Sequence, residues 1–148
     1  MGTSTTVTVT VLSKHMPKIK AMNSEGKLRQ WSDEVNHENG GAHLTSLTFY
    51  EIDCGNMDDD ESELMSANIP YDYDVDRTSE FDSIETVFRV DKDGNGRCWS
   101  FSGNERNTVE VDKLLDAYVH GTMQTFIKEI YDKKIPPSWK EQDKICSL

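Results

Sequence analysis

The sequence predicts an α+β domain in which a small antiparallel sheet of about four strands is packed by a long C-terminal amphipathic helix. Segments that alternate apolar and polar residues, as strands do, occur in the first two-thirds of the chain. An apolar stripe with helical spacing runs through residues 108–134. The length of 148 residues is that of one ordinary domain. We therefore expect a single domain over 1–148, with an acidic excursion at 54–82 and a short tail from residue 135.

Four stretches are expected to form the strands of this sheet. Residues 5–12 alternate Val with Thr, and residues 43–52 are rich in Thr, aromatic and aliphatic side chains. Residues 84–90 and 97–101 alternate on either side of a turn rich in Asp, Asn and Gly. Such a turn between two alternating runs predicts a β-hairpin.

Two segments between these strands have less regular patterns. The spacing of large apolar residues in 27–36 favours a short helix, and a hairpin over 19–26 is the alternative. Residues 54–82 lack a helical stripe and contain Pro70. We interpret them as an irregular excursion with one short edge strand.

The last third of the chain is expected to form one helix. Apolar pairs recur every four residues from Leu114 to Ile130, a capping-box spacing begins at Asn107, and two prolines at 136–137 end the pattern. A helix over 108–134 is about 40 Å long at roughly 1.5 Å per residue, which is more than a small sheet needs to be covered. Its apolar stripe is therefore either core or a face for oligomerisation.

The negative charge of the chain is concentrated in residues 51–85. The formal net charge is -11, and this segment holds thirteen Asp or Glu against one basic residue, Arg77, a net of -12. The other residues together are close to neutral. Such a surface repels nucleic acid and anionic membranes and attracts basic partners.

Several classes of site are absent from the sequence. Three cysteines without paired spacing argue against a disulfide framework and against a zinc site. There is no glycine-rich phosphate loop, and no apolar run approaches the roughly 18–20 residues of a membrane span. We expect a cytoplasmic protein with no cofactor and no metal.

Two His-x-Thr triplets form the most enzyme-like pattern. The triplets begin at His43 and His120 and include Thr45 and Thr122. They resemble the doubled motif of the 2H phosphoesterases over six residues. The resemblance implies a phosphodiesterase in which the two histidines face each other across a cleft as general acid and base, while the threonines hold phosphate oxygens. The second triplet falls inside the expected helix with His120 facing solvent, which disfavours this alternative.

Residues 91–96 match the first half of an EF-hand calcium loop. The match ends there, because Ser102 stands where the bidentate Glu is required and the flanks are expected strands. We expect a plain hairpin turn, with weak cation binding as the alternative.

The acidic segment is the leading candidate for a functional surface. If Tyr71–Asp76 is a strand, its aspartates share one face and its tyrosines the other, which places charge beside aromatic contact area. The alternative is a solvated loop that keeps the protein soluble. The candidate binding residues are Asp58, Asp59, Asp60, Glu61, Glu63, Tyr71, Asp72, Tyr73, Asp74 and Asp76.

The leading functional hypothesis is a non-enzymatic acidic inhibitor. By charge mimicry it would occlude the basic, nucleic-acid-binding surface of a partner protein; anti-restriction, anti-CRISPR and toxin-immunity proteins are the broad types. Neither direct nucleic-acid binding nor membrane binding is expected. The alternatives are the 2H-like phosphodiesterase and a structural subunit that forms homo-oligomers through the C-terminal helix.

Overall fold

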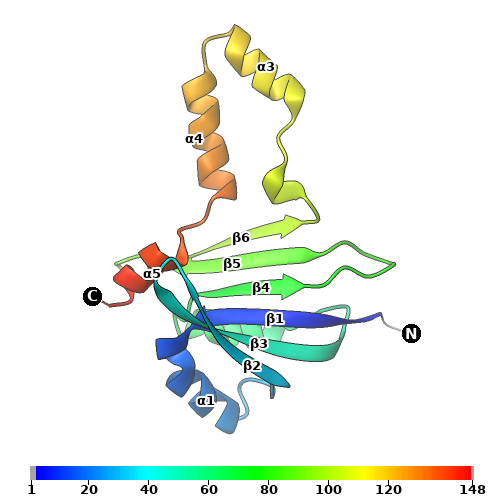
Figure 1. The fold of residues 1–148 in the computed structure, drawn as a ribbon, viewed down its shortest axis with the longest axis vertical. Coiled ribbons are helices and arrows are strands. Elements are labelled where there is room, and N and C mark those ends of the chain that lie inside the picture. Colours follow the sequence, from blue (N-terminus) through cyan, green and yellow to red (C-terminus); the bar gives the residue numbers. More distant parts are fainter. Residues whose placement is uncertain (1–2, 148) are drawn as a thin grey trace.

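A computed structural model describes residues 3–147 of the chain. Its centre is one sheet, with helices at both faces and a helical arm that extends from one edge (Figure 1). The elements in chain order are β1 (Ser4–Leu12), η1 (Ser13–His15), α1 (Met16–Ser24), β2 (Asp33–Asn39), β3 (Ala42–Asp53), α2 (Asp58–Ser66), β4 (Tyr71–Val75), β5 (Ile84–Val90), β6 (Gly96–Ser102), η2 (Glu105–Asn107), α3 (Val111–Val119), α4 (Met123–Lys134) and α5 (Trp139–Ile145).

The sheet has six strands in the order β2-β3-β1-β4-β5-β6, and every neighbouring pair is antiparallel. The first strand of the chain therefore lies in the interior of the sheet, between β3 and β4. Its alternation matches this position, because Val7, Val9 and Val11 are buried on one face while Thr6 and Thr8 are on the other.

The main core lies on the face of the sheet that α1 and α2 cover. Met16, Ile19 and Met22 from α1 and Leu64 from α2 pack in one cluster with the valines of β1. At one end of the other face, α5 docks through Trp139 against Leu12, Ala42 and Leu44. Burying these apolar side chains stabilises each layer by roughly 1.5–3 kcal/mol per large residue.

The expected four-strand sheet and long C-terminal helix are wrong. The sheet has six strands, and the C-terminal helix α5 has only seven residues. The strands expected near 5–12, 43–52, 84–90 and 97–101 are present as β1, β3, β5 and β6. The additional strands β2 and β4 come from the two less regular segments.

The helix expected over 108–134 is instead the helical hairpin of α3 and α4. Gly121 follows α3 with φ +69, the left-handed conformation that ends many helices. The amides of Gly121 and Thr122 donate to the carbonyls of Tyr118 and Ala117, at 3.4 and 2.9 Å. This Schellman-type ending reverses the chain, although the apolar spacing continues through the turn.

The helix expected over 27–36 is also wrong. Residues 33–39 form the edge strand β2, which pairs with β3 through a two-residue turn at Gly40 and Gly41. Both glycines have positive φ, 59° and 89°, as a tight hairpin turn requires. The hairpin alternative over 19–26 is wrong too, because most of that segment belongs to α1.

The acidic excursion at 54–82 contains two regular elements. Residues 58–66 form α2, with four acidic residues in its first turn, and residues 71–75 form β4. The predicted strand is thus present, but it is an interior strand between β1 and β5 and not an edge strand. None of the helices within residues 3–147 has the length and apolar character needed to cross a bilayer.

Candidate functional site

Two acidic segments, residues 53–59 and 76–82, lie at the same end of the sheet. β3 ends at Asp53 opposite Ser4 of β1, and β4 ends at Val75 opposite Val7 of the same strand. The loop from β3 to α2 and the loop from β4 to β5 therefore flank the beginning of β1. Strand order and the antiparallel directions produce this arrangement, because they bring the C-terminal ends of β3 and β4 to the same end of the sheet, beside the start of β1.

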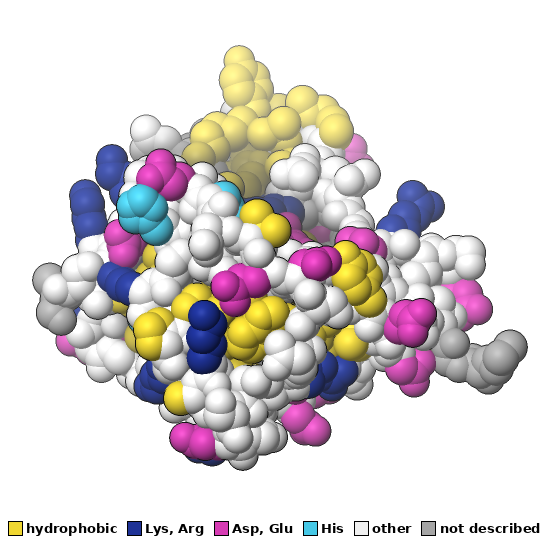
Figure 2. Space-filling view, turned by 60° about the horizontal axis from the view of Figure 1, so that its bottom comes forward, with side chains coloured by type: hydrophobic (Ala, Val, Ile, Leu, Met, Phe, Trp, Pro, Cys, Tyr) yellow, Lys and Arg dark blue, Asp and Glu magenta, His cyan; other side chains and the backbone are white. Residues whose placement is uncertain are grey.

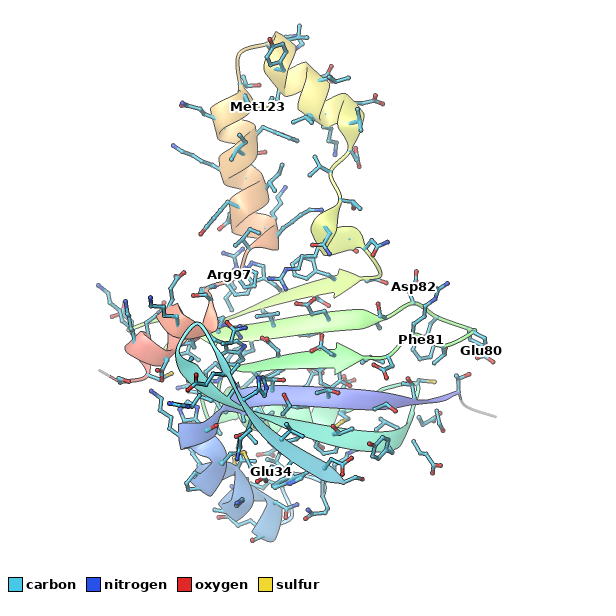
Figure 3. The ribbon with its side chains drawn as sticks, in the orientation of Figure 1. Glu34, Glu80, Phe81, Asp82, Arg97 and Met123 are labelled. Carbon is cyan, nitrogen blue, oxygen red and sulfur yellow. The ribbon has the colours of Figure 1, made fainter. Side chains whose placement is uncertain are left out.

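We call this surface the acidic end. It consists of six exposed carboxylates, and the only base in the two loops is Arg77, whose Nε lies 3.6 Å from Asp82. Glu80 and Asp82 lie at the tip of the β4–β5 loop, at the opposite end of the sheet from α5 (Figure 3). In Figure 2, several Asp and Glu side chains lie on the right of the view. The members of the acidic end are Asp53, Asp58, Asp59, Asp76, Glu80 and Asp82.

Backbone hydrogen bonds to β1 and to Thr3, the residue before it, hold the first residue of each loop of the acidic end. The Cys54 amide donates to the Thr3 carbonyl at 2.7 Å, and the Asp76 amide donates to the Thr6 carbonyl at 3.0 Å. Gly55 lies so close to β4 that an added Cβ would be 2.4 Å from Val75, so only glycine fits there. The loops are therefore fixed to the sheet and do not form a loose acidic segment.

The acidic residues in the first turn of α2 divide into exposed ones and ones that make contacts within the fold. Carboxylates in the first turn of a helix interact favourably with its dipole, and Asp58 and Asp59 are exposed there. Asp60 is buried and accepts the Arg29 amide at 3.2 Å. Glu61 accepts the Tyr71 hydroxyl at 2.8 Å, and burial raises the Glu61 pKa. Glu63 is half-buried.

The two tyrosines of the predicted contact strand lie in the core. Tyr71 and Tyr73 are 0% and 4% exposed, on the face of the sheet covered by α1 and α2. The hydroxyl of Tyr73 donates to the Gly55 carbonyl, and burial raises the pKa of both phenols. In this fold neither ring is available as an anchor for a partner.

The aspartates of β4 point to the opposite face of the sheet. The Asp72 carboxylate forms an ion pair with Arg89 at 2.8 Å and accepts the Trp139 indole N–H at 3.0 Å. The Arg89 guanidinium also stacks on the Trp139 ring, 4.0 Å from its centroid. These contacts hold α5 against the sheet, so Asp72 serves the fold.

Asp74 lies directly opposite Glu85 in the β4–β5 register. Burial, followed by the charges of Glu85 and Asp72, raises the pKa of Asp74 to about 7, and Arg106 opposes the shift. Arg106 forms an ion pair with Glu85. Asp74 and Glu85 are thus a pair of neighbouring carboxylates, with Arg106 of η2 bound to Glu85, and neither is part of the acidic end.

The two His-x-Thr triplets do not face each other across a cleft. His43 is on β3 and pairs with Glu38 at 3.2 Å, while the Thr45 hydroxyl donates to Asn36 at 2.8 Å. His120 and Thr122 lie in the α3–α4 turn, at the far end of the arm from the sheet (Figure 1). His43 and His120 line two separate pockets. The fold does not assemble the phosphodiesterase site that the triplets imply.

The half-match to a calcium loop is a hairpin turn. The Asp91 carboxylate accepts the amides of Asp93 and Asn95 at 2.8 and 2.9 Å, and these bonds lower the Asp91 pKa. The carboxylate of Asp91, the first ligand position of an EF-hand loop, is therefore used to hold the β5–β6 turn. Within residues 3–147, no cluster of three or more His, Cys, Asp or Glu is arranged to hold a metal ion.

The sequence matches no protein-family model, and no curated protein or solved structure is significantly similar to it. The residues and geometry above are thus the whole basis for assigning a function. Sequence reasoning did not single out Asp53, Glu80 or Asp82, although all three lie in the acidic segment. Their grouping depends on strand order, for which the sequence carries no local signal.

Proposed function

We propose that the protein is a non-enzymatic binding protein whose acidic end occupies a basic, nucleic-acid-binding surface of a partner protein. The observation that carries the proposal is the grouping of six exposed carboxylates at one end of the sheet, with one base among them: three lie at the end of β3 and the start of α2, and three lie in the β4–β5 loop. By occupying that surface, the protein would exclude the nucleic acid competitively.

The fixed position of the loops supports binding over a purely solubilising role. The first residue of each loop is hydrogen-bonded to β1 or to Thr3, so little conformational freedom would be lost when a partner binds. Clustered charge of one sign also accelerates encounter with a basic partner, and the acceleration falls as salt screens the charges. Binding is therefore expected to be strong at low salt and weak at high salt.

The contact surface differs from the strand stripe expected from the sequence. Asp72 is engaged by Arg89 and Trp139, and Asp60 is buried against Arg29. Reversing the charge of Asp72 or Asp60 would break these internal contacts and destabilise the fold, so a loss of binding could not be assigned to the interface. The informative positions are exposed members of the acidic end that make few internal contacts.

The test uses a fourfold charge reversal in the acidic end: Asp53→Lys, Asp59→Lys, Glu80→Lys and Asp82→Lys. The matched control reverses four exposed acids elsewhere: Glu25→Lys, Glu34→Lys, Glu38→Lys and Asp93→Lys. Both variants have a net charge of -3, from -11 plus 8. Each protein is immobilised, and proteins from a cell extract are captured at about 50 mM NaCl, where charge pairs are little screened.

We expect the wild type and the control to retain a basic protein that a short DNA or RNA duplex displaces, and the acidic-end variant to lose at least about 90% of it. Equal capture by the two variants would show that the acidic end is not the interface. Capture that no duplex can displace would rule out occlusion of a nucleic-acid-binding surface.

A further inference from the structure

A helical arm projects from the edge of the sheet next to β6 (Figure 1). The arm comprises residues 105–135, which include η2, α3 and α4. At its base, Arg97 pairs with Asp132 at 2.9 Å, and the Trp99 indole N–H donates to the Asp132 carbonyl at 3.0 Å. The arm is therefore anchored to β6 at the end of α4.

The exposed large hydrophobic residues are concentrated on this arm. Within residues 3–147, nine of the eleven exposed large hydrophobic residues belong to it. Tyr118 and Val119 are each 75% exposed. Figure 2 shows hydrophobic side chains gathered over the arm at the top of the view. The nine residues are Val109, Val111, Leu114, Leu115, Tyr118, Val119, Ile127, Tyr131 and Ile135.

The exposed residues follow helical spacing in both helices. In α3 the positions 111, 115 and 118 lie along one side, and in α4 the positions 127 and 131 are one turn apart. A stripe of this kind is the face that a helix normally buries. Each helix of the arm therefore has an apolar face without a partner in the described part of the chain.

The two helices do not close against each other. An open groove of about 700 Å³ lies between them, lined by apolar residues such as Ala117, Phe126 and Ile130 and by charged residues such as Glu110, Lys113 and Glu129. Helices that pack directly interdigitate their side chains and leave little space between them. Moreover, helices of 9 and 12 residues are marginally stable in water unless their apolar faces are packed. The arm thus lacks the packing partner that its two helices need to bury their apolar faces.

We propose that the arm is a dimerisation element, in which the α3–α4 hairpins of two copies of this chain pack as an antiparallel four-helix bundle. Two helical hairpins are the components of such a bundle, and a two-fold axis would place α3 of one copy beside α4 of the other. Side chains of one hairpin would fill the groove between α3 and α4 of the other copy.

The apolar area of the arm matches the requirement of a homodimer. Its nine side chains are 37–75% exposed. Multiplying these fractions by full side-chain areas of roughly 60–120 Å² per aliphatic residue and about 200 Å² per tyrosine gives an exposed area on the order of 600 Å². A standard interface takes about 800 Å² from each partner, and about 65% of that area is apolar in homodimers. The arm therefore supplies close to the apolar area that one partner contributes.

The charges of the arm also fit a second copy of the chain. The arm carries six acids and five bases, a net of -1, although the whole chain carries -11. Within the helix bounds, α3 has a net charge of -1 and α4 of +1, so α3 of one copy would meet a helix of opposite sign. The acidic end, where two copies would repel each other, is built from other elements.

The mass of the protein in solution tests this proposal without reference to any partner. We expect light scattering and sedimentation equilibrium at tens of micromolar to give twice the 16.9 kDa of one chain. The variant Tyr118→Asp/Val119→Lys keeps the net charge and changes two side chains that are 75% exposed in the monomer. It is expected to give 16.9 kDa, with self-association weakened at least about tenfold, because charges would be buried in an apolar interface.

The matched control is Tyr50→Asp/Val35→Lys, which makes the same substitutions at the two exposed hydrophobic residues outside the arm. It should remain dimeric. A wild type that is monomeric at several hundred micromolar would overturn the proposal, as would an arm variant that dimerises like the control. Circular dichroism verifies that both variants are folded, and Leu115→Lys provides a second arm substitution if the first is not.

Discussion

At the scale of single residues, two aspartates of β4 have opposite environments although they are two positions apart. Asp72 forms an ion pair with the Arg89 guanidinium and accepts the Trp139 indole N–H. Asp74 faces the Glu85 carboxylate in the neighbouring strand, and burial and this like charge disfavour its ionisation. Asp72 thus helps to hold α5 on the sheet, whereas Asp74 makes the free energy of unfolding depend on pH.

Replacing Asp74 with Asn is expected to change this pH dependence. Between the ordinary pKa of 3.8 and about 7, folded Asp74 holds a proton that the unfolded chain has released. The free energy of unfolding therefore falls as pH rises through this window, and the loss is complete above pH 7. In urea unfolding, Asp74→Asn should be more stable than wild type at pH 8 by on the order of 1–3 kcal/mol, with a smaller difference at pH 4.5.

Asp93, which is exposed in the β5–β6 turn and is not among the charges that act on Asp74, provides the control for this measurement. Asp93→Asn should retain the fall in the unfolding free energy between about pH 4 and 7. An Asp74→Asn protein that differs from wild type by the same amount at both pH values would contradict the proposed burial of that carboxyl.

At the scale of elements, the decisive feature is the turn that divides the last helical pattern into α3 and α4. Gly121 adopts φ +69, and no heavy atom lies within 4 Å of the position that a Cβ would take. The requirement for glycine is therefore one of backbone conformation and not of space. The turn creates the hairpin and so creates the apolar arm.

The sign of the effect of Gly121→Ala distinguishes a hairpin from a continuous helix. In a continuous helix, alanine would stabilise the chain by roughly 1 kcal/mol over glycine. In the left-handed turn, alanine should destabilise it by roughly 1–2 kcal/mol. Urea unfolding followed by circular dichroism at 222 nm measures the difference. Gly121→Asn should be tolerated better than Gly121→Ala, since asparagine visits this conformation more readily.

At the scale of the whole molecule, charge and apolar surface are segregated. The acidic end is made by the loops beside β1, and the exposed hydrophobic residues belong to the arm that extends from β6. A dimer joined through its arms would carry two acidic ends and could engage two sites on one target, which increases overall affinity without any new contact. Both proposed interactions are therefore compatible in one assembly.

The same segregation predicts a salt effect on stability. The carboxylates of the acidic end repel one another within a screening length of about 10 Å, and raising salt weakens that repulsion. Increasing NaCl from about 20 to 300 mM should raise the thermal midpoint by about 2–4 °C, the shift produced by roughly 1 kcal/mol in a chain of this size. Differential scanning calorimetry at one protein concentration measures it.

The two fourfold charge variants separate local repulsion from net charge. Both have a net charge of -3, but only the acidic-end variant removes clustered carboxylates. Its thermal midpoint should respond less to salt than that of the control variant. Equal responses would mean that net charge, and not the acidic end, governs the effect.

The local patterns of the sequence were sufficient to predict several elements. Period-two alternation predicted β1, the β5–β6 hairpin and the alternating faces of residues 71–75, because each residue of a strand reports the side to which it points. The concentration of negative charge in 51–85 is likewise a property of the sequence alone. The four acids that begin α2 and the Gly40-Gly41 turn before β3 are also local signals, for a helix start and for a hairpin.

Non-local pairing decided the rest of the fold. Alternation shows that Tyr71 and Asp72 point to opposite sides, but only the position of β4 between β1 and β5 buries the tyrosine and pairs the aspartate with Arg89. The acidic end exists because β3 and β4 both flank β1 and finish at the same end of the sheet. Such contacts join residues tens of positions apart, and their energies depend on which surfaces meet, so no local pattern contains them.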